Sequence, residues 1–131
     1  MVIDKNILDN LTVQAKSSPR LRIAFYLRNT PEDGSQRMLN ALEPGTVMPI
    51  HRHMASSETV VLLRSRIRWY FYDDAGKETK SIVLDANGDL HCINVEKARW
   101  HSLECLESGS VILECKDGKY EGLREEEVLE L

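Results

Sequence analysis

The chain of 131 residues lacks a long apolar run and contains little cysteine. No window approaches the roughly 18 apolar residues of a membrane span, and "MVIDKNILDN" lacks the charged start and apolar run of a signal peptide. Cys92, Cys105 and Cys115 are odd in number and lack C-x-x-C spacing, which favours three free thiols over a disulfide framework. Each lies in an apolar, strand-like stretch, which predicts a small core residue. We therefore expect a cytoplasmic protein with no membrane partner.

The chain also lacks an excess of basic residues. It has 17 lysines and arginines against 21 acidic residues, and its formal net charge is −4. Nucleic-acid binders usually carry a basic footprint, so we expect no nucleic-acid partner. The arginines of "RSRIRW" alternate along an expected strand, which indicates a solvated sheet face. With 42% hydrophobic and 29% charged residues, the composition is that of a globular protein with its own core.

Helical spacing of apolar residues marks residues 4–16, where Asp4 can cap a helix that "SSP" ends. Strand-like stretches then recur at intervals of about ten residues, as in sandwiches and barrels. We predict one all-β domain, residues 1–131, with an N-terminal helix and lead-in (1–19) and an acidic C-terminal tail (121–131), which is a possible helix. The expected extended stretches are 20–27, 36–45, 46–53, 58–76, 79–86, 90–96, 100–106 and 110–116.

The stretch 58–76 is too long for one flat strand, so we expect two strands with a tight bend near Ser65. In the second strand, side chains alternate between two faces. Ile67, Trp69 and Phe71 are expected to face the interior. The residues expected on the opposite face are Arg66, Arg68, Tyr70 and Tyr72.

The stretch "HRHMASSE" holds two of the chain's four histidines. Residues i and i+2 of a strand point to one face, so His51 and His53 are aimed together and Arg52 points away. A turn through "MASS" brings Glu58 back beside them, and a barrel can add His101 from a distant strand. Three nitrogens and one oxygen suit one divalent transition metal, namely Fe, Mn, Co, Ni or Zn. The alternatives are a surface histidine pair and a solvated carboxylate.

The spacing in this stretch resembles the first cupin motif. Gly45 is followed by five residues, then by His51-x-His53, four residues and Glu58. Cupins usually carry Gly at the closing position, where this chain has Ser65. The departure affects the geometry of a turn and leaves the ligand positions intact.

The second cupin motif is eroded in "EKARWH". Glu96 and Ala98 replace the usual Pro and Gly, and Cys105 stands where Asn is usual. His101 is retained, so the resemblance implies a metal site made by His101 with the ligands of the first motif.

Across nearly the whole chain, the pattern resembles the WbuC-type cupin-fold metalloproteins. This resemblance implies a double-stranded β-helix, or jelly-roll barrel, with the metal inside its mouth. It also hints at bacterial surface-polysaccharide synthesis and a sugar or sugar-nucleotide substrate. Because cupin barrels pair through exposed edge strands, we expect a homodimer. The matching stretches are "SPRLR", "QRMLNALEPGT", "HRH", "VVLLRSRI" and "LECKDGKYEG".

Two charged residues are candidates for catalysis. If "ESGS" closes a two-residue hairpin at 108–109, His101 faces Lys116 and Leu103 faces Glu114. Lys116 or Glu114 then lies beside the metal as a proton carrier or substrate anchor. A slip of one residue in register would instead turn both side chains to solvent.

Two residues of the preceding strand are candidates for substrate binding. Asn40 and Arg37 are an odd number of positions apart, so only one can face inward on a regular strand. Asn40 is a candidate for the pocket lining. Arg37 is a candidate for an anionic substrate or a dimer surface, and an exposed charge is the alternative for both.

Three functions are compatible with these features. The first is a metal-dependent enzyme, an isomerase, epimerase, lyase or oxygenase, acting on a small polar substrate related to carbohydrates. The second is a non-catalytic, metal-dependent binding or sensor module. The third is a degenerate cupin that keeps the fold for assembly, which the complete ligand set disfavours.

Overall fold

The computed structural model describes residues 1–129, so the last two residues of the predicted tail lie outside the described residues. Helix α1 (Lys5–Ser17) comes first and a short 3₁₀ turn, η1 (Glu125–Glu127), comes last. None of the described helices is long and apolar enough to cross a membrane. The strands between them are β1 (Arg22–Tyr26), β2 (Ser35–Leu42), β3 (Glu58–Arg64), β4 (Arg66–Tyr72), β5 (Glu78–Asp85), β6 (Cys92–Val95), β7 (His101–Cys105) and β8 (Ser110–Asp117).

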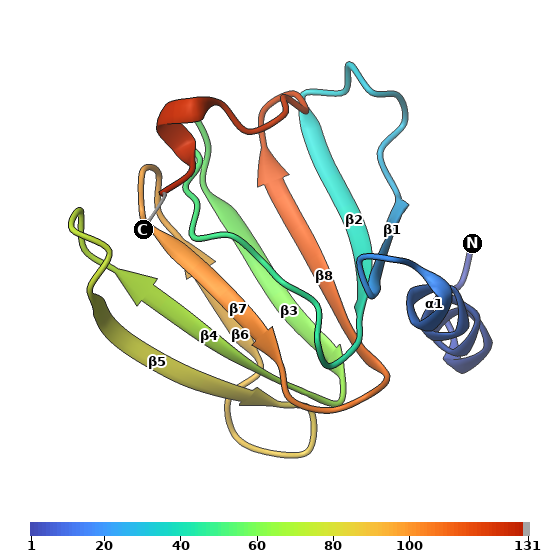
Figure 1. Cartoon of the computed structure of the whole chain (residues 1–131). Coiled ribbons are helices and arrows are strands. Elements are labelled where there is room, and N and C mark those ends of the chain that lie inside the picture. Colours follow the sequence, from blue (N-terminus) through green and yellow to red (C-terminus); the bar gives the residue numbers. More distant parts are fainter. Residues whose placement is uncertain (130–131) are drawn as a thin grey trace.

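The strands form two antiparallel sheets that face each other (Figure 1). One sheet has the order β1-β2-β8-β3-β6, and the other has the order β5-β4-β7. Their inner faces enclose the main core, and the predicted all-β class with a short N-terminal helix is confirmed. Buried members of this core include Leu42, Val60, Leu62, Ile67, Trp69, Leu84, Leu103 and Ile112.

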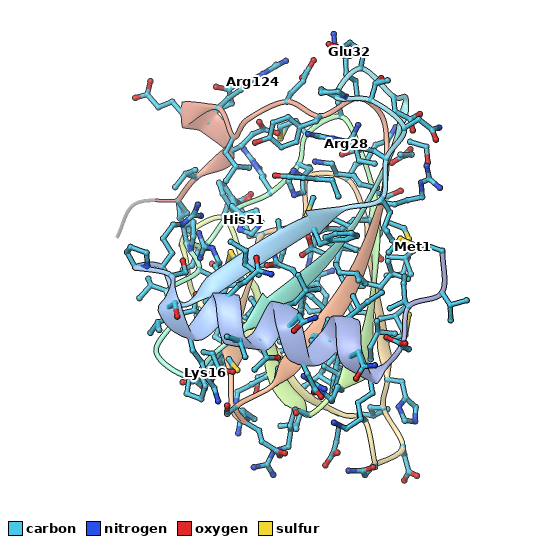
Figure 2. The ribbon with its side chains drawn as sticks, turned by 90° about the vertical axis from the view of Figure 1, so that its right-hand side faces the viewer. Met1, Lys16, Arg28, Glu32, His51 and Arg124 are labelled. Carbon is cyan, nitrogen blue, oxygen red and sulfur yellow. The ribbon has the colours of Figure 1, made fainter. Side chains whose placement is uncertain are left out.

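Helix α1 lies on the outer face of β1 and β2 (Figure 2). The Asp4 carboxylate accepts a hydrogen bond from the Ile7 amide at 3.1 Å, as expected of an N-terminal cap. Leu11 and Ala15 pack against Leu39 of β2 in a second apolar cluster. The odd-numbered residues of β2 therefore face the helix, and the even-numbered ones face the barrel interior.

The predicted bend at Ser65 is confirmed, and it carries the chain from one sheet to the other. Ser65 has a φ of 68°, a left-handed conformation that favours Gly. Its hydroxyl donates to the Ser108 carbonyl at 3.1 Å. As predicted, Ile67, Trp69 and Phe71 are buried on the inner face of β4.

The predicted hairpin between β7 and β8 is wrong. Strand β7 pairs with β4, and β8 lies between β2 and β3 in the other sheet. Residues 106–109 therefore cross from one sheet to the other. This crossing lets β7 and β8 each pack an apolar inner face against the opposite sheet. Buried Glu43 holds this crossover by accepting hydrogen bonds from the Ser108 hydroxyl at 2.6 Å and the Gly109 amide at 2.7 Å.

The core prediction for the cysteines is correct only for Cys105, which is buried. Cys92 is exposed, because it alternates on β6 with the buried Ile93 and Val95. Cys115 is partly exposed on β8. The burial of these cysteines therefore depends on which face of the strand they occupy, and not on how apolar their sequence neighbours are.

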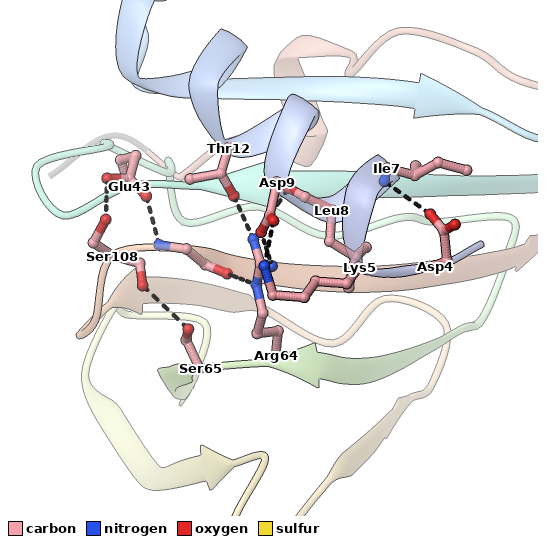
Figure 3. Close-up of polar contacts among 11 residues, drawn as sticks. Asp4, Lys5, Ile7, Leu8, Asp9, Thr12, Glu43, Arg64, Ser65 and Ser108 are labelled. Carbon is pink, nitrogen blue, oxygen red and sulfur yellow. Dashed lines mark hydrogen bonds and ion pairs between the residues drawn. The ribbon is translucent and has the colours of Figure 1, made fainter.

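Arg64, at the end of β3, joins helix α1 to the barrel (Figure 3). Its Nη1 lies 2.6 Å from the Asp9 carboxylate, and its Nη2 donates to the Thr12 hydroxyl at 2.8 Å and to the Leu8 carbonyl at 3.1 Å. Its Nε donates to the Gly109 carbonyl at 2.8 Å. One side chain thus links the helix, β3 and the crossover loop.

Arg64→Ala should lower the free energy of unfolding by roughly 2 kcal/mol, because hydrogen bonds to charged groups contribute about 1.5–3 kcal/mol. Urea denaturation followed by circular dichroism measures this loss. Arg68→Ala, on the outer face of β4, is the matched control and should change stability by less than about 0.5 kcal/mol. Equal losses in the two variants would show that the Arg64 contacts do not anchor the helix.

Candidate metal centre

The stretch that carries the first two histidines runs alongside β7. His51 and His101 exchange two backbone hydrogen bonds, of 3.0 Å from the His51 amide and 2.9 Å from the His101 amide. The Ser102 hydroxyl also donates to the Met48 carbonyl at 2.9 Å. The turn before this stretch contains Gly45, whose φ of 100° explains why Gly occupies that motif position.

Residues 118–129, here called the C-terminal segment, hold the other side of the histidine stretch. The Arg52 amide donates to the Glu127 carbonyl, and the Leu129 amide donates to the Ile50 carbonyl, both at 2.9 Å. The Glu127 carboxylate accepts from the Met54 amide at 2.8 Å. The sequence predicts only an acidic tail here, and no pattern in the tail indicates that it binds the histidine stretch.

The three candidate imidazoles meet between these elements. One ring nitrogen from each of His51, His53 and His101 lies within 4.8 Å of the others. The ring centroids of His51 and His101 are 4.3 Å apart, and those of His51 and His53 are 5.3 Å apart. His101 is 1% exposed, so the cluster has a buried side. Of the remaining predicted features, Arg52 points away, with its guanidinium 4.2 Å over the Trp100 ring, and the fourth histidine, His91, is exposed.

Two backbone carbonyls set the orientation of these rings. The Nδ1 atoms of His51 and His101 lie 2.9 Å from the Pro49 carbonyl and 2.8 Å from the Arg99 carbonyl. A carbonyl oxygen can only accept, so each Nδ1 carries the proton. The Nε2 atoms of the neutral rings then present lone pairs, as in metal-bound histidines.

Trp69 supports the His101 ring from one side. The two rings stack with centroids 5.3 Å apart and planes 9° apart. Trp69 is itself 1% exposed in the core, so it cannot move freely. Sequence alternation places Trp69 inside, but the strand pairing that brings it to His101 could not be read from the sequence.

Glu58, the first residue of β3, completes the set. Its Oε1 lies 3.0 Å from His101 Nε2 and 3.9 Å from His53 Nε2. His101 Nε2 is nevertheless buried without a properly aligned hydrogen bond among the described residues. A lone pair and a carboxylate oxygen in close contact favour a bridging cation. Imidazole nitrogens and a carboxylate oxygen are ligand types of divalent transition metals, so the residues present fit a metal.

The electrostatics of the site favour the protonation states that bind metal. Burial, together with the nearby His101, lowers the pKa of His51 to about 4, and burial also lowers the pKa of His53. Burial would raise the pKa of Glu58, but contact with His101 and the attraction of the histidines in their protonated forms outweigh it and lower this pKa. At neutral pH, His51 and His53 are therefore neutral and Glu58 is ionised.

A cavity of about 560 Å³ opens in front of these residues. Glu114 and Lys116 line it because β8 lies beside β3, where Lys116 pairs with Glu58. The pairing of β8 with β3, and not the predicted hairpin, brings them near the candidate metal ligands. Asn40, on an even-numbered position of β2, also lines the cavity.

Arg37 does not border this cavity. It lies on the face of β2 that carries Leu39, and its Nη2 is 3.5 Å from the Asp33 carboxylate. Arg20 and Arg22 line the cavity instead, and no sequence motif marks them. Their spacing of two residues indicates a shared face, but the sequence does not say which face is inward.

Ala98 adopts a φ of 63°, so the second-motif turn keeps a left-handed residue without Gly. Its amide donates to the His53 carbonyl at 2.8 Å. The eroded motif therefore still supports the histidine stretch. Ala98 carries some backbone strain, because a left-handed conformation is unfavourable for a residue with a side chain.

Solved structures of low sequence identity share this fold. KdgF from Halomonas sp. is 14% identical with a TM-score of 0.62, over 79% of this chain and 84% of that chain. The capsular polysaccharide assembling protein CapF from Staphylococcus aureus is 17% identical with a TM-score of 0.66, over 80% of this chain but only 30% of that chain. A cupin 2 domain-containing protein from Halorhodospira halophila is 16% identical with a TM-score of 0.61, over 79% and 68%.

At these identities the likeness establishes the fold alone, and the two facing antiparallel sheets form a jelly roll of the cupin type. The chain belongs to the family described as "Domain of unknown function (DUF6016)", whose model matches residues 3–84. No protein with a curated description is significantly similar to it in sequence.

Glu127→Ala should speed amide hydrogen exchange at residues 51–54, because the Met54 amide loses its carboxylate acceptor. A hydrogen bond to a charged acceptor contributes about 1.5 kcal/mol, so exchange should rise by up to roughly tenfold. Mass spectrometry after deuterium labelling measures this change. Glu126→Ala, at an exposed neighbouring residue, is the control. Unchanged protection in Glu127→Ala would mean that the Glu127 carboxylate does not hold the histidine stretch.

Proposed function

We propose that this cupin binds one divalent transition metal and acts as a metal-dependent enzyme on a small polar ligand. The observation that carries the proposal is the buried Nε2 of His101, which faces Glu58 and two further imidazoles at the wall of a cavity. A cavity of about 560 Å³ is within the range of small-molecule sites.

The residues that would hold the metal are His51, His53, His101 and Glu58. Three nitrogens and one oxygen suit Fe, Mn, Co, Ni or Zn. Such an ion would polarise a carbonyl or hydroxyl group of the ligand, or activate water. The backbone carbonyls of Pro49 and Arg99 hold the imidazoles of His51 and His101 in the ligating tautomer, and Trp69 covers one face of His101.

Glu114 is the proposed proton donor. Burial and the neighbouring Glu58 carboxylate raise its pKa to about 8, against the opposing charges of Lys116 and Arg22. A neutral carboxyl group at pH 7 can give its proton to a ligand oxygen. Lys116 is proposed as a substrate anchor, and Asn40 as a hydrogen-bonding partner of ligand hydroxyl groups.

A carbohydrate or a sugar-nucleotide relative is the proposed substrate, in bacterial surface-polysaccharide synthesis. Two observations support this: the resemblance to WbuC-type cupins, and the fold shared with the capsular polysaccharide assembling protein. Both are analogies of family and fold. The homodimer and the cytoplasmic location stay predictions.

Purified protein should contain close to one equivalent of transition metal, and replacing both His51 and His53 with Ala should remove it. Elemental analysis by mass spectrometry measures the content, and anomalous scattering identifies the ion. His91→Ala is the matched control, because His91 is exposed and outside the cluster. Full metal retention in the double variant would refute the metal centre.

Glu114→Gln should slow the turnover of any substrate by roughly 10²–10⁴-fold while metal content stays the same, because the amide cannot donate a carboxyl proton. Sugar nucleotides and small acids are to be screened for turnover with the Fe, Mn and Zn forms. Tight binding without turnover in the unaltered protein would favour the binding or sensor module. Full activity in Glu114→Gln would exclude Glu114 as proton donor.

A further inference from the structure

One side of the cavity gathers positive charge. Arg20 and Arg22 reach it from the start of β1, and Lys116 reaches it from β8. Within residues 1–129, no carboxylate lies within 4.0 Å of any of these three side chains. Three cations that share a cavity without close acidic partners indicate a site for a negatively charged ligand.

Arg22 is the best placed of the three. Its Nη1 donates to the Val47 carbonyl at 2.6 Å, which anchors one edge of the guanidinium. In the described part of the chain, its Nε and Nη2 donate no hydrogen bond to protein. Burial lowers the pKa of Arg22, and the charge of Arg20 lowers it further. An anion between these groups would offset both effects.

The acidic residues of the cavity do not pair with these cations. Glu58 faces the histidines, and Glu121 pairs with Arg124 at 3.0 Å. Glu114 lies opposite Val60 in the strand register, and among the described residues it makes no ion pair with Arg20, Arg22 or Lys116. Three cations thus gather at one side of the cavity in a chain whose formal net charge is −4, so this local charge does not follow from composition.

We propose that the ligand of the metal cavity is a small organic oxyanion, whose carboxylate or phosphate is bound by Arg22 with Arg20 and Lys116 nearby. The rest of the ligand reaches towards the histidine cluster, where the Asn40 amide also lines the wall. A guanidinium fork matches the oxygens of both anions. This inference rests on the proposed function and names its substrate class.

The test compares acids with neutral partners of the same shape. Glucuronate is paired with glucuronamide, gluconate with gluconamide and glycolate with glycolamide, and glucose 6-phosphate is paired with glucose. Binding to the purified, metal-containing protein is measured by calorimetry at low and high salt. At least one acid should bind roughly tenfold or more tightly than its neutral partner, and high salt should reduce the difference.

Arg22→Gln should weaken binding of that acid roughly tenfold or more, and Arg22→Lys should retain part of the affinity as a point charge. Arg68→Gln removes the same charge from the outer face of β4 and should leave binding unchanged. Thermal unfolding checks that each variant is folded. A preference for glucose 6-phosphate over the carboxylates assigns a phosphate ligand, and the reverse assigns a carboxylate.

The inference is overturned if no acid binds more tightly than its neutral partner, including the case in which none binds. Equal affinity in Arg22→Gln and Arg68→Gln also overturns it. Metal content is measured on the same samples, with the variant lacking His51 and His53. Metal retention in that variant refutes the metal centre alone, and loss of acid preference in metal-loaded protein refutes the oxyanion site alone.

Discussion

The site depends on the paired backbone hydrogen bonds between His51 and His101, of 3.0 and 2.9 Å. They join two segments that lie 50 positions apart in the sequence, and they bring the motif stretch to the edge of β7. His53, two positions on, then reaches the same side, and β3 begins with Glu58. The C-terminal segment covers the other edge of the stretch, so its backbone groups are paired on both sides. The positions of the candidate metal-binding side chains therefore follow from backbone hydrogen bonding.

The interior of the barrel is divided between an apolar part and a polar part, and strand register produces this division. Across the five-stranded sheet, Glu58 pairs with Lys116, and Val60 pairs with Glu114. One further step along, Leu62 pairs with Ile112, and both belong to the closed apolar core. The inner face of the sheet thus changes from charged to apolar residues within two inward-facing positions along β3. The apolar part stabilises the fold by burial, and it leaves the polar part with a rigid wall.

Local sequence patterns predict those structural features that are determined within a single segment of the chain. Alternation places Ile67 and Trp69 inside and aims two histidines together, and Asp4 caps the helix as expected. Pairing between distant strands could not be read in this way. The loop before Ser110 has the length of a hairpin, but burial of two apolar faces sends its strands to different sheets. Arg22 lines the cavity and Arg37 does not, and the sequence does not distinguish them, since nothing local tells which face of a strand the barrel encloses.

Glu114 connects the two ends of the cavity through its charge. The Glu58 carboxylate raises its pKa, whereas Lys116 and Arg22 lower it. A metal ion on Glu58 would weaken the first influence, and an anion on Arg22 would weaken the second. The metal and an anionic ligand would therefore shift the pKa of Glu114 in opposite directions. A neutral ligand lacks the contribution at Arg22, so a metal would then favour the ionised form of Glu114, which cannot donate a proton. By this reasoning, the charge of the ligand helps to keep Glu114 in the protonated form that a general acid requires.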